Sequence, residues 1–262
     1  MDCALPEGAT LATALGLVVR APTMRAGRPW RWRVHARSLD LSLDADQAEA
    51  ATEVEQRGLI LSCGAALHHL RIAAAALGWV ARVRRAPRVA DPNHLATVEL
   101  LRHRPTALDS DLSAAITSRQ SDHRHYGQCP VPHGFRTLVS ERVVRLGGAV
   151  HEATGGPRDQ LLAATDVVAG SETGSPDGAE FLVVSTAADD RAAWLDAGEA
   201  LSAMVLTSTT VGLASCLLGD ALEDAVRRAD IRAAVLHDLT FPQAVVRVGW
   251  PPIPLAQLPR PA

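Results

Sequence analysis

Two stretches of the chain carry the same pattern of small residues at the same interval. Gly64-Ala-Ala-Leu67 is followed, fourteen residues after its glycine, by Gly78, and Gly198-Glu-Ala-Leu201 is followed at the same interval by Gly212. Each stretch is rich in alanine, with apolar residues at helical spacing, and predicts a long helix that ends at glycine. Helices that pack with their small residues facing each other would relate two units by a pseudo-twofold axis. The alternative is that two alanine-rich helices match by chance.

Further helices and strands are predicted around these two helices. The first helix, 8–20, ends before Pro22, because the residue that precedes a proline avoids the helical conformation. Apolar and polar residues alternate at 30–35 and again at 39–43, which indicates a strand hairpin. The other predicted helices are 59–79, 109–117 with Asp109 or Ser110 as N-cap, 134–147, 157–168, 192–212 and 222–229, and the other predicted strands are 80–84, 96–101, 149–153, 180–185 and 243–249.

Charge and composition narrow the classes of partner. The chain has 262 residues, 47% of them hydrophobic, and a net charge of -3, which is typical of a soluble globular protein. No basic block indicates nucleic-acid binding. All 26 basic residues are arginines, so a Schiff-base lysine is excluded. A phosphate group would have to be bound by arginine, by backbone N–H groups or by a helix N-terminus.

The cysteines and the N-terminus bear on the cellular compartment. Cys3, Cys63, Cys129 and Cys216 lack CxxC spacing, which favours buried free thiols in a reducing compartment over a zinc site or a disulfide framework. The N-terminus does not have the pattern of a signal peptide, and no run of about 18 apolar residues predicts a membrane span. We therefore expect a cytoplasmic protein that does not bind a membrane.

Histidines and acidic residues give no clear metal site or acid–base pair. His68 and His69 are adjacent on a helix, so we expect one to be half-buried and one solvated. His123, His125 and His133 lie in one loop region, where two of them could chelate a metal, but the sequence offers no matching carboxylate pattern or third ligand. We expect no metal site. The acidic residues expected to be helix N-terminal charges are Asp189, Asp190, Asp196 and Glu199.

Four blocks of the sequence resemble the Acg family of nitroreductase-fold flavoproteins. They are 20–32 (RAPTMRAGRPWRW), 61–71 (LSCGAALHHLR), 198–206 (GEALSAMVL) with 212–216 (GLASC), and 241–249 (FPQAVVRVG). The resemblance implies an α+β fold in which antiparallel-rich sheets flank two long central helices. It also implies one domain made of two pseudo-symmetric halves, 1–108 and 109–262, with FMN in the crevice between them.

Two features of the chain depart from the family. The first block of relatives reads Ala-Pro-Ser-x-His-Asn-x-Gln-Pro-Trp, and here Arg25, Ala26 and Arg28 replace the His, Asn and Gln. Arginine only donates hydrogen bonds, whereas an amide both donates and accepts at the flavin edge. Arg25 and Arg28 are therefore either flavin ligands of altered chemistry or solvated loop residues. The second departure is the short connector 170–178, where the family carries a helix and a lid-like segment.

The loop 118–126 (SRQSDHRHY) is similar to the family's phosphate-binding Arg-Arg-Thr-Asp-Arg motif. Arg119 matches its first arginine and Ser121 its threonine, but Gln120 and His123 stand where arginines are expected. Arg124 lies next in the chain and can contribute a charge-assisted bond to phosphate. The alternative is an ordinary polar surface turn.

The resemblance implies an FMN-dependent NAD(P)H oxidoreductase that reduces a small nitroaromatic, quinone or similar acceptor, as a monomer or homodimer. Its cofactor-binding residues would be Arg20, Thr23, Arg25 and Arg28 at the flavin, Arg119, Ser121 and Arg124 at the phosphate, and Ser215 in a backbone turn near the flavin. No catalytic side chain is predicted, because the cofactor carries the chemistry. The alternative function is a degenerate relative without redox activity, which sequesters flavin or serves as a binding or regulatory module.

Overall fold

The computed structural model describes residues 5–85, 91–164 and 177–251. The first half contains, in chain order, α1 (Gly8–Val18), β1 (Trp30–Val34), β2 (Leu39–Leu43), α2 (Ala45–Ala50), α3 (Glu53–Ala76), β3 (Trp79–Arg84) and β4 (His94–Arg102). The second contains α4 (Ala107–Ser118), α5 (His133–Val144), β5 (Gly148–Ala153), α6 (Gly155–Ala163), β6 (Glu180–Thr186), α7 (Arg191–Thr210), β7 (Ala214–Leu217), η1 (Gly219–Leu222), α8 (Ala225–Leu236) and β8 (Phe241–Gly249).

Two four-stranded antiparallel sheets have equivalent strand orders. The first is β1-β2-β4-β3 and the second is β5-β6-β8-β7. In each sheet the two strands before the long helix pair with each other, and the two strands after it complete the sheet. Trp30 pairs with Leu43 and Val34 with Leu39, so the predicted first hairpin is confirmed. The chain therefore repeats one strand-strand-helix-strand-strand unit.

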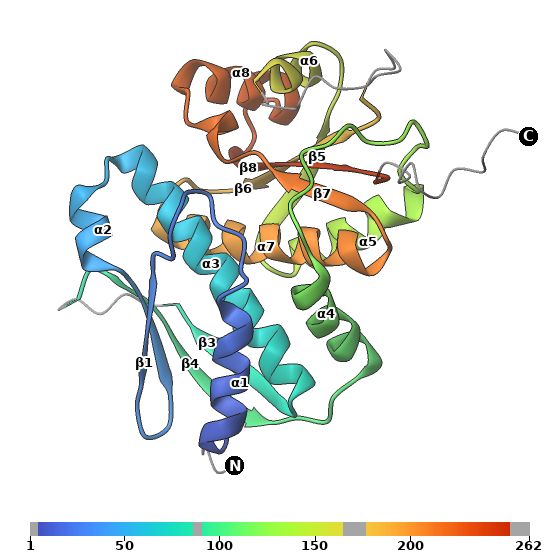
Figure 1. Ribbon diagram of the computed structural model, residues 1–262. Helices are drawn as coiled ribbons and strands as arrows, with labels where there is room; N and C mark the ends of the chain where they lie inside the picture. The colour runs from blue at the N-terminus through green and yellow to red at the C-terminus, as the bar shows by residue number, and fades with distance from the viewer. Residues whose placement is uncertain (1–4, 86–90, 165–176, 252–262) are drawn as a thin grey trace, which may run out of the picture.

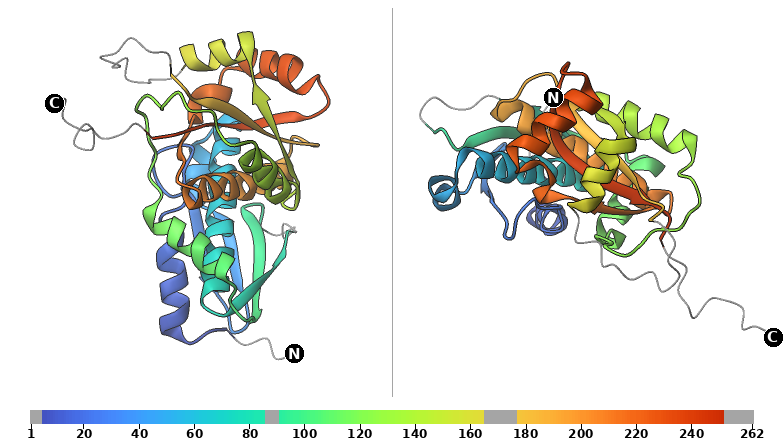
Figure 2. Two further views of the ribbon diagram at one scale, coloured as in Figure 1. Left: turned by 90° about the vertical axis from the view of Figure 1, so that its right-hand side faces the viewer. Right: turned by 90° about the horizontal axis from the view of Figure 1, so that it is seen from above.

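The two long helices α3 and α7 cross between the sheets (Figure 1, with a second direction in Figure 2). Gly64 and Gly198 meet at the crossing: a Cβ at Gly64 would lie 2.1 Å from the carbonyl oxygen of Leu195, and a Cβ at Gly198 would lie 2.0 Å from that of Leu61. Only glycine permits such a close approach of two helix backbones. The predicted packing of small residues against each other is therefore confirmed, and its contacts are reciprocal.

The hydrophobic core follows this arrangement. One cluster of buried side chains joins α1, the first sheet and α3, and a second joins α5, α7 and one face of the second sheet. A third cluster covers the opposite face of the second sheet, where α6, α8 and η1 pack over buried residues such as Phe181 and Val245. The second sheet is therefore buried on both faces, and its strand β6 reads as a continuous apolar run for this reason.

The antiparallel sheets and central helices confirm the predicted α+β architecture, with differences at element ends. α3 begins at Glu53, six residues before the predicted start, because Thr52 and Glu55 form a capping box. α4 is capped by Thr106 rather than by Asp109 or Ser110, and Asp109 closes the capping box from inside the helix. β7, α2 and η1 were not predicted. The connector 170–178 and the tail beyond Trp250 lie largely outside the described residues.

One described helix, α3, is long and apolar enough by composition to cross a membrane. In the structure 83% of its most apolar window is buried inside the protein, which is the environment of a core helix. Its small and apolar residues contact α7, α1 and the first sheet.

Candidate functional site

The loop that follows α4 is held against the edge of the second sheet. Ser121 forms a parallel bridge with Ser215 of β7, and the Asp122 N–H donates to the Ser215 carbonyl oxygen at 3.1 Å. Further along, the Gly127 N–H donates to the Trp250 carbonyl oxygen at 2.9 Å. Ser215 thus lies in a strand rather than in the predicted turn, and it brings the predicted phosphate loop to the end of α7.

A cavity of about 760 Å³ lies under this loop, within the size range of small-molecule sites. Its walls come from the loop itself, from the C-terminal end of α7 and from the chain that enters β7. The lining residues are Ser118, Arg119, Gln120, Ser121, Asp122, His123, Arg124, Thr209, Gly212, Leu213, Ala214 and Pro251. The three residues predicted to bind phosphate therefore line one cavity.

Arg119 is the half-buried cation of this cavity. Its Nη2 donates to the Arg20 carbonyl oxygen at 3.4 Å, and its buried Nε has no hydrogen-bond partner among the described residues. Burial, and next the nearby charge of Arg20, lower the pKa of Arg119. A guanidinium in such surroundings is stabilised by an anion. Arg119 is therefore the residue of the loop best prepared to bind a phosphate group.

Arg124 differs, because it already has a carboxylate partner. Its Nη2 lies 2.7 Å from Asp122 Oδ2 and its Nε donates to Asp122 Oδ1 at 2.9 Å. The hydrogen bonds from Arg124 hold the pKa of Asp122 below its usual value, against the effect of burial. The Arg124 side chain is 62% exposed. The Arg124 side chain can turn toward a ligand, but Asp122 already neutralises its positive charge.

A fully buried ion pair supports the loop from behind. Arg247 of β8 donates from Nε to Asp177 Oδ2 at 2.8 Å and from Nη2 to the Arg124 carbonyl oxygen at 2.7 Å. Asp177 accepts the Tyr126 N–H at 2.8 Å, and the Arg247 guanidinium lies 3.8 Å from the centre of the Tyr126 ring. Sequence analysis missed this pair. The signal for it was a charged residue, Arg247, inside an otherwise apolar strand.

Cys216 lies beside His123, which the sequence could not show. The Cys216 Sγ is 3.5 Å from His123 Nδ1. Burial raises the pKa of the Cys216 thiol, so the neutral thiol is favoured at neutral pH. The pair is therefore a packed contact of β7 with the loop, and it does not have the properties of an activated nucleophile.

The first block, which follows α1, divides between two places. Arg20 caps α4: its Nε and Nη2 donate to the carbonyl oxygens of Ile116 and Thr117 at 3.2 and 2.8 Å. Arg25 forms ion pairs with Glu55 and Glu223, each at 3.0 Å, and lines a separate hollow of about 300 Å³.

Two other predicted residues of this block, Thr23 and Arg28, do not line the cavity under the 118–124 loop. Thr23 is half-buried between Arg20 and Arg25 in the chain, and Arg28 is exposed, with its carbonyl oxygen 3.5 Å from Gln47 Nε2. The structure thus brings Arg20, Arg119, Ser121, Arg124 and Ser215 together. It places the Arg25 side chain beside Glu55 at the start of α3, and the Arg28 backbone beside Gln47 of α2.

Two expectations about charged and polar core residues were wrong. His68 and His69 are both buried, and His68 Nδ1 lies 2.9 Å from Ser202 Oγ of α7. Glu199 is fully buried in the middle of α7, where it accepts a hydrogen bond from Arg71 at 2.6 Å and forms an ion pair with Arg85. Glu199 thus joins α7 to α3 and β3, and it is no helix N-terminal charge.

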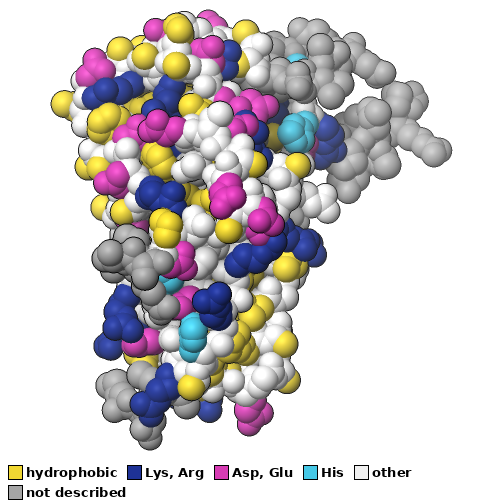
Figure 3. Space-filling view, turned by 90° about the vertical axis from the view of Figure 1, so that its left-hand side faces the viewer, with side chains coloured by type: hydrophobic (Ala, Val, Ile, Leu, Met, Phe, Trp, Pro, Cys, Tyr) yellow, Lys and Arg dark blue, Asp and Glu magenta, His cyan; other side chains and the backbone are white. Residues whose placement is uncertain are grey.

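The surface does not concentrate one sign of charge on the face drawn in Figure 3. Arginines and carboxylates are interspersed there over the first sheet and the helices above it. The described residues of this face thus carry both signs of charge side by side.

Comparisons with known proteins place the chain in a family. No family model matches the sequence. The chain is 36% identical over 314 aligned residues to the Mycobacterium tuberculosis protein "Putative NAD(P)H nitroreductase Rv3131", with 99% of this chain and 91% of the relative covered. It is 31% identical to "Putative NAD(P)H nitroreductase acg" of the same organism, with 92% of this chain and 89% of the relative covered.

A solved structure shows the same fold at low sequence identity. It is described as a "putative nitroreductase" from Anabaena variabilis, and it matches with a TM-score of 0.59 and 11% identity, over 82% of this chain and 69% of the other. The reciprocal helix crossing, the two equivalent sheets and the identity to the two mycobacterial relatives lead to one conclusion. The chain belongs to the Acg family of nitroreductase-fold proteins.

Proposed function

We propose that this protein binds FMN at the cavity under the 118–124 loop and acts as an NAD(P)H-dependent oxidoreductase of nitroreductase type. The observation that carries the proposal is Arg119, whose buried Nε has no partner among the described residues and whose pKa burial and Arg20 depress. The names of the mycobacterial relatives as NAD(P)H nitroreductases support the same assignment. The cavity of about 760 Å³ leaves room for a phosphate and the groups attached to it.

The residues of the cavity fit an anionic group better than a neutral one. Arg119 and the Ser121 hydroxyl would bind the phosphate of FMN, and Arg124 would add a second, weaker contact by turning from Asp122. Arg20 would fix the position of Arg119 through its carbonyl oxygen and through its cap on α4. When bound, FMN would supply the redox chemistry, taking electrons from NADH or NADPH and passing them to a nitroaromatic or quinone acceptor.

We also propose that the two halves, 1–108 and 109–262, are the fused equivalents of two subunits. The equal strand orders and the reciprocal contacts of Gly64 and Gly198 support this division. A chain that contains both halves can be active as a monomer, and a homodimer is compatible with it. A small-molecule acceptor and a cytoplasmic location are part of this proposal.

A second candidate is a family member that has lost redox activity and only retains flavin or serves a regulatory role. The observation that favours it is the double ion pair of Arg25 with Glu55 and Glu223, because these carboxylates occupy the guanidinium expected at the flavin. Arg28 is exposed and does not line the cavity.

Titration with FMN followed by desalting tests the proposal. The expected result is a yellow protein with one FMN per chain and a shifted flavin absorption band, which loses its colour when NADH or NADPH is added anaerobically. A protein that stays colourless contradicts the proposal outright. A yellow protein that neither nucleotide reduces supports the second candidate.

A further inference from the structure

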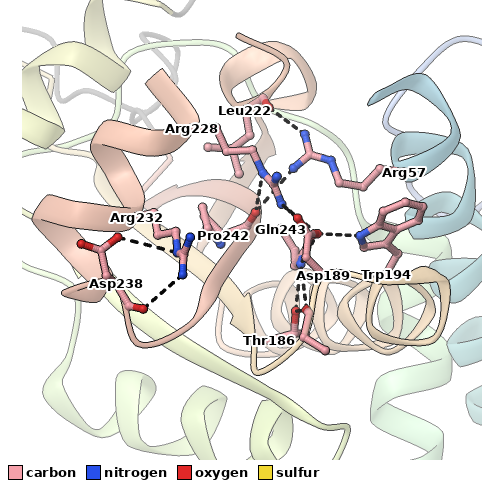
Figure 4. A network of polar contacts seen from close by, with 11 residues as sticks. Arg57, Thr186, Asp189, Trp194, Leu222, Arg228, Arg232, Asp238, Pro242 and Gln243 are labelled. Carbon is pink, nitrogen blue, oxygen red and sulfur yellow. Dashed lines mark hydrogen bonds and ion pairs between the residues drawn. The ribbon is translucent and has the colours of Figure 1, made fainter. Parts of the chain in front are cut away.

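A second cavity, unrelated to the 118–124 loop, lies where the start of α3 meets α8. Its volume is about 350 Å³, and it is closed by the starts of α7 and β8 and by the end of η1. Figure 4 shows the polar groups at this place. Three arginines, Arg57, Arg228 and Arg232, line it together with apolar and aromatic side chains. No part of the proposed redox chemistry uses these residues.

Arg57 is a buried cation in this cavity without a counter-ion. It is 6% exposed, and its guanidinium donates to two backbone carbonyl oxygens, that of Leu222 at 2.7 Å and that of Pro242 at 3.5 Å. Among the described residues no carboxylate lies within ion-pair distance of it. Burial, and next the charge of Arg228, lower the pKa of Arg57 to about 10. A positive charge in such a place is stabilised by a ligand that brings a negative one.

The acidic residues near Arg57 already have other partners. Asp189 accepts hydrogen bonds from Arg228 Nη2 at 2.8 and 2.9 Å, from Trp194 Nε1 at 2.7 Å and from Gln243 Nε2 at 3.1 Å. Although burial opposes this, these hydrogen bonds hold the pKa of Asp189 below its usual value. Glu223, on the same wall, accepts both hydrogen bonds of Arg25.

Arg232 adds a second donor that is not satisfied by the protein. Its guanidinium stacks 4.3 Å from the centre of the Phe241 ring, and its buried Nε has no hydrogen-bond partner among the described residues. The nearest carboxylate, that of Asp238, has its Oδ1 3.7 Å from this Nε. The cavity therefore has two guanidinium groups with free donor capacity on either side of Arg228.

Apart from the arginines and the carboxylates of Glu53, Asp189 and Glu223, the cavity wall is apolar. The Trp194 indole and the Phe241 ring face it, and Val54, Leu222, Ala225 and Ala229 complete the lining. Such a wall contacts a flat hydrocarbon body, and the guanidinium groups can bind a carboxylate attached to it. Arg57 has no ion-pair partner among the described residues, and the carboxylates of Glu53, Asp189 and Glu223 also line the cavity, so a monoanion fits better than a dianion. A volume of about 350 Å³ limits the ligand to one or two rings.

We propose that this cavity is a binding site for a small aromatic carboxylate, with the carboxylate on Arg57 and the ring against the apolar part of the cavity wall. The site is independent of flavin binding. It lies against the segment η1–α8, which is inserted between β7 and β8, whereas the described residues between β3 and β4 form no such segment.

Fluorine NMR with 4-fluorobenzoate tests this proposal on the full chain. We expect saturable broadening of the ligand signal, at least tenfold weaker affinity in Arg57→Gln, and affinity within twofold of the wild type in the exposed control Arg104→Gln. The neutral analogue 4-fluorobenzamide should compete at least tenfold less well. Val54→Trp, which fills the half-exposed entrance and leaves the arginines in place, should abolish binding without unfolding the protein.

Three results would overturn the proposal. They are equal binding of the benzamide, unchanged affinity in Val54→Trp and Arg57→Gln with both variants folded by circular dichroism, or displacement of the benzoate by inorganic phosphate at lower concentration than by benzoate itself. Absence of any saturable signal from 4-fluorobenzoate would likewise overturn it. FMN titration of the same samples should be unchanged, which separates this site from the one under the 118–124 loop.

Discussion

The two halves of the molecule share one frame, which consists of a four-stranded sheet and a long helix. They differ in the segments that are added to this frame. β1-β2-α3-β3-β4 and β5-β6-α7-β7-β8 have the same topology, and Gly64 and Gly198 occupy equivalent places at the crossing. In the first half the chain passes from β3 to β4 through 85–93, whereas the second half inserts η1 and α8 between β7 and β8. The cavity beside Arg57 lies under this inserted segment.

The shared frame is visible in pairs of residues 134 positions apart, the offset between the two crossing glycines. Arg57, in the first half, donates to the carbonyl oxygen of Pro242, and Arg191, its equivalent in the second, donates to that of Pro92 at 3.0 Å. Arg57 is buried under the inserted segment, whereas Arg191 is only half-buried. Arg191 thus only holds two segments together, whereas Arg57 at the equivalent position also lines a cavity.

The largest expected effect comes from the crossing itself. Gly198→Ala should lower the free energy of unfolding by about 3 kcal/mol or more, because the added Cβ would lie 2.0 Å from a backbone carbonyl oxygen that cannot move aside. Gly64→Ala should lose a similar amount, since the contact is reciprocal. Urea unfolding at neutral pH measures both.

Gly16→Ala in α1 is the matched control for these two variants. No atom lies within 4 Å of a Cβ at that position, so alanine should raise the free energy of unfolding by up to about 1 kcal/mol through its helix propensity. Equal stability of all three variants would show that the two helices do not approach at these glycines.

The next largest effect concerns a position at which the halves differ inside the frame. Glu199 is fully buried between Arg71 and Arg85, and the equivalent residue of α3 is Ala65. Glu199→Ala should lower the free energy of unfolding by about 3 kcal/mol, because two guanidinium groups lose their buried partner. The value is at the low end of the usual range, since both arginines keep about a third of their side-chain surface exposed.

Thermal and urea unfolding of Glu199→Ala measure this effect against Glu141→Ala. Glu141 is exposed on α5, and its replacement should change the free energy of unfolding by less than about 0.5 kcal/mol. If the two variants were equally stable, the contacts of Glu199 with Arg71 and Arg85 would not stabilise the packing of the two halves.

Much of this frame could be predicted from the sequence, and the sites only in part. The repeated glycines predicted the helix crossing because a close approach of two helices needs only a small residue at the same place in each helix, and this can be seen in the sequence. The loop with Arg119 and Ser121 was predicted from the family resemblance. The partners of Glu199, Arg247 and Arg57 could not be predicted, because each lies more than 60 residues away in the chain and is brought near by tertiary packing.

The prediction that one of His68 and His69 is exposed was wrong for the same reason. Helical periodicity assumes one solvated face, but α3 is enclosed by α1, α4, α7 and the first sheet. β7 was missed because its four residues, Ala214–Leu217, follow directly on a helix end and read as part of a turn.

A third prediction uses the pair His68 and Ser202, which occupy equivalent positions of the two helices and contact each other. Burial lowers the pKa of His68 to about 3, and that of His69 also to about 3, from an ordinary value near 6.5. The unfolded chain therefore binds more protons than the folded protein between pH 6.5 and pH 3. Stability is complete above pH 6.5 and falls as the pH is lowered through this window.

Urea unfolding at pH 7 and at pH 5 measures this dependence. Each of the two histidines should remove roughly 2 kcal/mol from the free energy of unfolding over this step. His68→Gln keeps a polar partner for Ser202 and should reduce the loss by about that amount, whereas the exposed control His133→Gln should not change it. An unaltered pH dependence in His68→Gln would mean that the residue is hydrated in solution.

The smallest effect distinguishes the two loops that follow α1 and α4. In the first loop Arg20 donates to carbonyl oxygens and Arg25 pairs with two carboxylates, whereas Arg119 of the second keeps an unpaired donor. If FMN binds under the second loop, Arg119→Gln should weaken FMN binding by about tenfold, and Arg124→Gln by about twofold to threefold, since Asp122 already compensates its charge.

Fluorescence titration of FMN measures these affinities, with Arg25→Gln as the variant that decides between the loops. Arg25→Gln should leave the affinity within twofold of the wild type, because its ion pairs with Glu55 and Glu223 hold it outside the cavity. A larger loss in Arg25→Gln than in Arg119→Gln would move the flavin site to the loop after α1. That result would mean that the ligand breaks both ion pairs of Arg25, which only a strongly anionic group could do.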